Sequence, residues 1–525
     1  MKHATNSPLE EKGSSKLFEY GFIILLLIVI MILYFNQQVL INDKSRIIML
    51  VYTIIYILIG ITAFILIKSQ SIKELKIEKV FIICIIPLGI IYTLLFPQGI
   101  VPDEWTHMYF VDSLASQITG KEVNTKVTMR TVDVQLYNMQ IQNPNSDYYT
   151  YIFDNIIDFT SNNEYTNINI DSVSLTSLFA YFPSVIGTII SRFFGFGAVM
   201  TVYFARLCNF AFYFSITYQA IKKLPFGKLL LLAITMLPMT CHQMFSLSYD
   251  AVVNATSFFC ISYGLFFIYE AKKIQFSDLI LYSICSILVL ANKGSAYAFI
   301  LVIPILAKYF NPNGDLIAKK TKIIIFLILI ISILLLNYRS LMNVSSNSGI
   351  QAVSGSGIVP WTGTPSYTLS TLLNDIPRTI NLFINTFVEK GWWYITTAIG
   401  GALGWLSILL PNWIINIWLG VLVLSSMSEK SNNDVFTYEH KLLYFLTSFG
   451  IILLVMLAMA LAWTPMGYAT IEGVQGRYFI PIIFLLFICL QNTKLYLKEN
   501  MIKIVLAIIP IMSVISIYNL IPLVL

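Results

Sequence analysis

Long blocks of apolar residues alternate with shorter polar segments along most of the chain. The blocks run roughly over 17–35, 47–67, 80–96, 198–219, 228–245, 251–269, 276–291, 295–310, 322–337, 411–427, 440–462, 477–491 and 503–522. A helix that crosses a bilayer needs about 20 such residues. The pattern therefore predicts an all-α polytopic membrane protein with about 13 transmembrane helices.

Composition agrees with this prediction and excludes other classes of protein. Only 11% of the 525 residues are charged and 57% are hydrophobic, whereas a soluble protein carries about 25% charged residues. The 6 cysteines are scattered through apolar blocks without paired spacing. This scatter argues against a disulfide framework and against a cysteine metal cage.

Basic residues gather in alternate loops, and this places the ends of the predicted helices on two sides. Lysines cluster in the segments 68–79, 222–228, 272–273, 308–322 and 494–503. Since positively charged loops favour the cytoplasm, all five face the cytoplasm if the N-terminus does. The acidic segment 97–175 then forms a large first external loop. A loop of this length is usually functional.

Residues 176–194 are apolar enough to form a further span, but a span here would move the lysines at 222–228 outside. We therefore favour a helix that lies along the external membrane surface. Pro183 and Gly187 would interrupt this helix, and Arg192 would reach the lipid headgroups. The alternative, a transmembrane helix at this position, stays open.

A second external region covers 338–410. It begins with a flexible Ser/Gly-rich stretch, in which 340–366 could close over a site, and its end carries Trp392, Trp393 and Trp405. Tryptophans suit interfacial helices. The predicted divisions are N-terminal transmembrane helices, a first external loop with a juxtamembrane helix, a central bundle, the second external region and C-terminal transmembrane helices, over 1–96, 97–197, 198–337, 338–410 and 411–525.

Four polar strings lie at the external ends of predicted spans. They are PDEWTH at 102–107, HQMFSLSYD at 242–250, NKGSAY at 292–297 and GYATIEGVQGRY at 467–478. Ionisable residues at membrane depth are costly and usually mark a functional site. We therefore predict one site on the extracytoplasmic face.

Asp103, Glu104 and His107 allow two interpretations. Acidic residues at a helix start are favoured by the helix dipole, so Asp103 and Glu104 can be purely structural. Alternatively, Asp103 and His107 share a helical face, and a carboxylate beside an imidazole can act as a general base. With Asp250, the same three residues could also bind a divalent cation, the one cofactor that the sequence suggests.

The other polar strings offer similar choices. Asp250 or Ser248 could cap the next helix, and Lys293 could extend to the lipid headgroups. Arg477, which lies between Gln475 and Tyr478 and beside two glycines, suits a phosphate. Its structural alternative is an ion pair with Glu472.

These motifs resemble a bacterial integral membrane family catalogued as domain of unknown function 2142. The strings that carry the resemblance are PDEWTH, SLSYD at 246–250, LANKGSAY at 290–297, LGWLSILLPNW at 403–413 and GVQGRYFIP at 473–481. They span about residues 95 to 490. That family in turn resembles the type C glycosyltransferases, which take sugars from polyprenyl-phosphate donors.

The resemblance implies roles for particular residues. An essential acidic residue follows a span in the first external loop of type C enzymes, as Asp103 does here, and juxtamembrane helices follow it, as 176–194 would. A second acidic residue lies in the next external loop, where this chain has Asp250. Donor phosphate binding falls to Arg477 and Lys293, with Gln475 and Tyr478 beside them.

We therefore expect a membrane glycosyltransferase of the bacterial plasma membrane, with its active site outside. The donor would be a polyprenyl-phosphate sugar and the acceptor a cell-wall or surface glycan; no nucleic acid partner is expected. Two other functions stay open. One is a transporter or flippase of a lipid-linked sugar, and the other is a non-enzymatic scaffold in cell-envelope synthesis.

Overall fold

The computed structural model describes residues 76–121, 126–143, 145–160, 164–171, 173–270, 274–292, 296–304, 358–429 and 436–524, with isolated positions 54, 323, 324, 327 and 331. Apart from these isolated positions, the apolar blocks predicted at 17–35, 47–67 and 322–337 lie outside the described residues, as does most of the flexible stretch 340–366.

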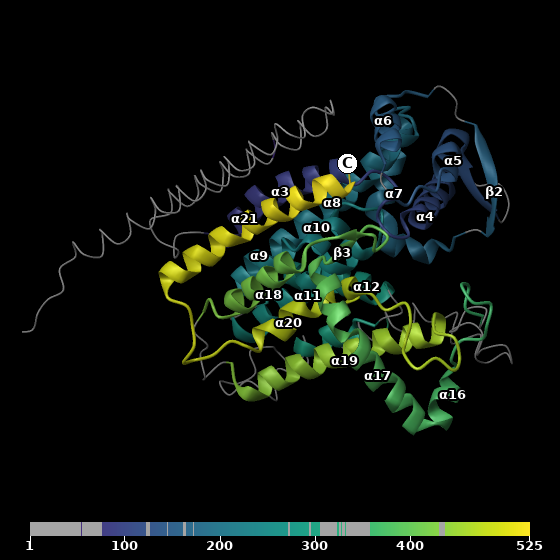
Figure 1. Ribbon diagram of the computed structural model, residues 1–525. Helices are drawn as coiled ribbons and strands as arrows, with labels where there is room; N and C mark the ends of the chain where they lie inside the picture. The colour runs from purple at the N-terminus through teal and green to yellow at the C-terminus, as the bar shows by residue number, and fades with distance from the viewer. Residues whose placement is uncertain are drawn as a thin grey trace, which may run out of the picture.

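A bundle of long apolar helices forms most of the described molecule (Figure 1). Five of these helices are long and apolar enough to cross a membrane: α3 (Ile77–Leu95), α8 (Ala198–Lys223), α11 (Asp250–Tyr269), α19 (Tyr438–Ala462) and α21 (Glu499–Val524). Three shorter apolar helical segments accompany them: α12 (Phe276–Ala291), α18 (Asn412–Ser426) and the consecutive pair η6 (Gly476–Phe479) and α20 (Ile480–Ile488). The polytopic class predicted from the sequence is thus confirmed.

Helix α11 lies at the centre of the bundle. Of its most apolar window, 94% is buried inside the protein, against 33% for α19 at the periphery. A helix that is apolar on all sides is buried among other helices or in a membrane. Asp250 is the first residue of this buried helix, so the bundle fixes its position.

Helix ends meet at two opposite ends of the bundle, as the lysine-rich loops predict. At one end, Lys223 forms an ion pair of 3.2 Å with Asp278, and the Leu497 N–H donates to the Met427 carbonyl at 2.9 Å. The polar strings meet at the other end. The alternation predicted from the charges therefore holds for these helices.

The predicted span 228–245 is wrong as a single helix. The structure has two short helices here, α9 (Lys228–Thr235) and α10 (Pro238–Met244). Pro238 has no N–H to continue the hydrogen-bond ladder, and its ring disfavours helical backbone at the preceding residue, so the chain breaks before it.

Beyond one end of the bundle, the loop that the sequence predicts to be external folds into a unit of its own, which we call the loop unit (Figure 1). It contains α4 (Glu104–Ile118), β1 (Lys126–Arg130), α5 (Thr131–Asn138), α6 (Ser146–Asp154), β2 (Tyr165–Asp171), η3 (Leu175–Ser177) and α7 (Leu178–Phe193). Strands β1 and β2 pair antiparallel, and a separate hydrophobic core that includes Trp105, Leu136 and Ile152 holds the unit together. The fold is mainly helical, but these strands depart from the all-α prediction.

Helix α7 differs in three respects from the surface helix that we expected. It is continuous, with Pro183 inside it. It packs antiparallel along α8. The two helices approach so closely that a Cβ on Gly187 would lie 2.4 Å from the Phe204 carbonyl oxygen. Arg192 does not reach outward: its side chain is 7% exposed and pairs with carboxylates inside the loop unit.

The second external region is helical where it is described. It contains α16 (Leu369–Asn374), α17 (Ile376–Ile399) and a two-stranded sheet of β3 (Ala402–Leu403) and β4 (Ile408–Leu409). The short helix η5 (Ala298–Val302) comes before this region in the chain. Trp392 is 60% exposed on α17, as an interfacial helix would have it. Trp405 instead turns inward and donates from Nε1 to the Gly99 carbonyl at 2.8 Å.

Candidate functional site

Asp103 occupies a strained position between α3 and α4. It precedes the first residue of α4 with φ 62° and ψ 9°, in the left-handed region, and its side chain makes no capping hydrogen bond. A non-glycine residue in this region is uncommon and costs about 1–3 kcal/mol. The Asp103 carboxylate therefore does not cap α4 through a hydrogen bond.

The Asp103 carboxylate turns instead towards Arg477, far away in the sequence. Arg477 Nη2 donates to Asp103 Oδ2 at 3.0 Å, and Arg477 Nε lies 3.6 Å from Asp250 Oδ2. The side chains of Arg477 and Asp250 are 4% and 7% exposed, whereas that of Asp103 is 49% exposed. Three residues predicted from separate motifs thus meet, with one carboxylate open to the surroundings.

The hydrogen bonds of Arg477 are incomplete. Within the described part of the chain, Nε and Nη1 have no hydrogen-bond partner although both atoms are buried. A buried donor without a partner costs about 1–3 kcal/mol, more when it is charged. Such a guanidinium is suited to an oxyanion, which would accept from the unpaired N–H groups.

Glycine packing sets the position of Arg477. A Cβ on Gly476 would lie 2.2 Å from the Tyr394 carbonyl oxygen in α17, and the Gly476 N–H donates to Thr397 Oγ1 at 3.2 Å. The sequence suggested that these glycines admit a ligand. In the structure, Gly476 admits a neighbouring helix, which holds Arg477 in place.

The neighbours of Arg477 have mixed roles. The alternative pair with Glu472 does not form, because Glu472 pairs with Lys390 at 2.6 Å. The Tyr478 carbonyl accepts from Tyr297 Oη at 2.8 Å, and Gln475 Oε1 is buried without a hydrogen-bond partner among the described residues. Gln475 and Tyr478 are next to Arg477 in the chain, and their contact with a phosphate stays a prediction.

Glu104 is fully engaged with a partner that the motifs did not suggest. Arg206 donates to its carboxylate through Nε at 2.9 Å and Nη2 at 2.5 Å, and the N–H groups of Gly99 and Leu247 donate to it as well. Arg206 also donates to the Phe96 carbonyl at 2.7 Å. The sequence did offer one signal for this pair: Arg206 is a lone arginine inside an apolar span, and such a charge needs a buried partner.

His107 is held by an aromatic group. Its Nδ1 lies 2.7 Å from Tyr181 Oη, and its ring packs edge-on against Tyr249 at 5.3 Å. Burial lowers the pKa of His107 to about 4, although nearby Asp103 and Asp250 oppose this shift. The imidazole is therefore neutral near pH 7.

Ser248 supports Asp250. Its Oγ accepts from the Asp250 N–H at 3.1 Å, and Asn209 Nδ2 donates to the Ser246 and Ser248 carbonyls at 2.6 and 3.1 Å. Neither of the two predicted capping residues is the N-cap of α11, because Tyr249 occupies that position and makes no side-chain capping hydrogen bond. The Asp250 carboxylate remains directed at Arg477.

Two further predictions concern Lys293 as a phosphate ligand and a divalent metal site. Lys293, expected to bind phosphate, lies outside the described residues. Among the residues that the structure does describe, no group of three or more His, Cys, Asp or Glu side chains is arranged to hold a metal ion. Glu104 in particular is occupied by Arg206.

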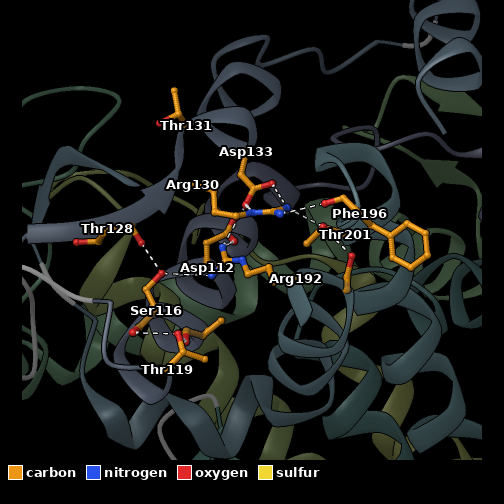
Figure 2. Close-up of polar contacts among 12 residues, drawn as sticks. Asp112, Ser116, Thr119, Thr128, Arg130, Thr131, Asp133, Arg192, Phe196 and Thr201 are labelled. Atoms are coloured by element: carbon orange, nitrogen blue, oxygen red, sulfur yellow. Dashed lines mark hydrogen bonds and ion pairs between the residues drawn. The ribbon is translucent and has the colours of Figure 1, made fainter. Parts of the chain in front are cut away.

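A second polar cluster, missed by the sequence analysis, lies inside the loop unit (Figure 2). Arg130 donates to both carboxylate oxygens of Asp133 at 2.8 and 2.9 Å and to Thr201 at 2.9 Å. Arg192 pairs with Asp112 and Asp133. Burial raises the pKa of Asp112 to about 7, against the opposing effect of Arg192. We call these four charged residues the loop-unit cluster.

Comparison with known proteins gives one match. The family model described as predicted membrane protein (DUF2142) matches residues 86–486. The chain therefore belongs to this family, as its motifs indicated. No curated protein and no solved structure matches the chain.

Proposed function

Starting from a polytopic member of this family, we propose a glycosyltransferase that moves a sugar from a polyprenyl-phosphate donor to a glycan acceptor on the extracytoplasmic face of the plasma membrane. The observation that carries the proposal is the meeting of Arg477 with Asp103 and Asp250. One buried guanidinium has unpaired donors, and beside it stands a half-exposed carboxylate.

Each group has a task in this reaction. Asp103 takes the proton from the acceptor hydroxyl as the general base. The acceptor oxygen attacks the anomeric carbon, the bond between that carbon and the phosphate oxygen breaks, and the configuration inverts. Arg477 donates to the phosphate and stabilises the negative charge that develops on it.

The remaining residues position these two groups. The ion pair between Glu104 and Arg206 fixes the start of α4. The Glu104 carboxylate accepts four hydrogen bonds from the protein, so we give it a positioning role. His107, neutral near pH 7, lies one helical turn after the base, and its side chain hydrogen-bonds with Tyr181. Asp250 balances the charge of Arg477 before the donor arrives. Lys293, Gln475 and Tyr478 stay predicted phosphate contacts.

The flippase is less well supported than the transferase. The main sign of a polar path across the bundle was Arg206, a charge inside a span. Arg206 is 0% exposed and paired with Glu104, so its role in this structure is to hold α4 against α8.

Purified protein in nanodiscs, given a labelled polyprenyl-phosphate sugar and bacterial envelope extract, tests the proposal. Transfer of label to glycan with release of the lipid phosphate supports it. Movement of intact donor between leaflets without product would favour the flippase. If the protein neither transfers label nor moves the donor, a scaffold would be favoured.

A further inference from the structure

We propose that the outward face of α4, continued by α5, binds an uncharged glycan. The residues are Thr106, Tyr109 and Phe110 of α4 and Tyr137 of α5, which we call the aromatic face. This inference rests on the proposed function: the glycan would be the acceptor, and the aromatic face would hold the part of it that lies beyond the reacting sugar.

The aromatic face continues from the open side of Asp103. Positions 103, 106 and 110 follow the spacing of one helical face, and Thr106 is exposed while Tyr109 and Phe110 are half-buried. Arg477 and Asp250, by contrast, are buried. An acceptor therefore reaches Asp103 from the side of α4, opposite the phosphate-binding guanidinium.

The distance suits a ligand of more than one sugar. Seven residues separate positions 103 and 110, a rise of about 10 Å along the helix axis. A single pyranose ring is too short to contact both Asp103 and Phe110. An oligosaccharide with its terminal hydroxyl at Asp103 would place a later sugar over the rings.

Neighbouring side chains hold the rings in fixed positions. Phe110 stacks on Tyr181 with ring centroids 5.5 Å apart and an interplanar angle of 28°. Tyr109 lies 4.7 Å from Phe110 and meets Tyr137 edge-on at 6.3 Å. Tyr181 also contacts His107, so the same aromatic packing supports both the rings and the site.

The chemistry of the aromatic face matches a neutral sugar. None of its four residues is charged, and the hydroxyls of Tyr109 and Tyr137 make no hydrogen bond within the described part of the chain. Aromatic rings offer an apolar surface to the C–H face of a sugar, while hydroxyls exchange hydrogen bonds with its hydroxyls. A charged ligand would find no opposite charge on these residues.

Binding of full-length protein in nanodiscs to an array of neutral bacterial surface oligosaccharides tests this inference. We expect the wild type to bind at least one oligosaccharide and Phe110→Ala and Tyr137→Ala to bind it at least tenfold more weakly. Tyr137→Phe, which keeps the ring, should lose about threefold through its hydroxyl. Tyr438→Ala is the matched control, because Tyr438 is 76% exposed at the start of α19.

Other outcomes separate this inference from the proposed function. Equal binding by wild type, Phe110→Ala and Tyr137→Phe would overturn the aromatic face and leave the transferase intact. Failure of the wild type to bind any oligosaccharide would also overturn it. Failure of the wild type to bind undecaprenyl phosphate is a separate result, which would count against the proposed function itself.

Discussion

Two buried arginine clusters differ in how completely their hydrogen bonds are satisfied. In the loop-unit cluster, two arginines face two aspartates, and Arg130 also donates to the Phe196 carbonyl and to Thr201. One buried nitrogen of this cluster, Arg192 Nε, makes no hydrogen bond among the described residues. All four charged side chains there are at most 7% exposed. Around Arg477, two carboxylates face one guanidinium and Asp103 is 49% exposed. Two buried nitrogens, Nε and Nη1, make no hydrogen bond among the described residues, although Nε lies 3.6 Å from Asp250 Oδ2.

The difference distinguishes a structural cluster from a binding site. Buried charges that pair with one another hold elements together, and removing one member leaves an uncompensated charge. A buried donor without a partner is rare in folded proteins and calls for a ligand or water. The charges of the loop-unit cluster balance and none is open to the surroundings, which suits a structural role in holding α4, α5, α7 and α8 together. The Arg477 cluster has an open carboxylate and two buried nitrogens without hydrogen bonds among the described residues, and we propose that it receives a substrate.

The largest effect on activity is expected from Asp103→Asn. Loss of a general base lowers the rate by about 100- to 10,000-fold, and a half-exposed side chain contributes little to stability. Labelled donor consumption measures the rate, and size-exclusion chromatography checks folding. Asp147→Asn, an exposed acid of α6, should transfer at the wild-type rate; full activity in Asp103→Asn would contradict the role of the base.

Arg192→Gln should act on stability instead. It leaves Asp112 and Asp133 without one of their buried partners, and breaking a buried ion pair costs about 3–5 kcal/mol. Thermal unfolding of the purified protein measures the loss. Arg378→Gln, at an exposed position in α17, is the control and should unfold like the wild type; an equally small change in Arg192→Gln would show that the loop-unit cluster is not structural.

The protein should become less stable as the pH falls through the range in which His107 titrates. Its pKa in the folded protein is about 4, below the usual 6.5, so the unfolded chain binds more protons between these values. Stability therefore rises with pH across this window and is lost as pH falls through it. Thermal unfolding of wild type and His107→Gln from pH 4 to 6.5 checks this, and parallel pH profiles would refute it.

Tyr181→Phe should have the smallest effect. It removes the 2.7 Å contact with His107 while keeping the ring that packs on Phe110. One hydrogen bond contributes about 1 kcal/mol to stability. A modest decrease in melting temperature with the folded state retained is the expected result; unfolding of the variant would mean that this hydroxyl carries more of the site than the geometry indicates.

The residues that meet at the site were predictable from the sequence. Scarce charges stood at the ends of apolar spans, and buried charges need partners, so Asp103, Asp250 and Arg477 were identifiable before their contacts were known. The alternation of basic loops also predicted which helix ends lie together, and Lys223 with Asp278 confirms it.

Pairing between distant residues was not predictable in the same way. Nothing local shows that Glu104, and not Asp103, pairs with Arg206, because the two carboxylates are adjacent in the PDE motif. Arg192 ends an apolar helix and looked suited to headgroups, but its partners come from α4 and α5. These choices depend on tertiary packing, which hydrophobic pattern alone does not specify.

Binding of undecaprenyl phosphate by wild type, Arg477→Gln and Arg192→Gln in nanodiscs tests the central claim most directly. If the unpaired donors of Arg477 receive the lipid phosphate, Arg477→Gln should bind at least tenfold more weakly, since hydrogen bonds to charged groups contribute about 1.5–3 kcal/mol. Folded Arg192→Gln should bind like the wild type. Equal affinity of Arg477→Gln and wild type would contradict the claim.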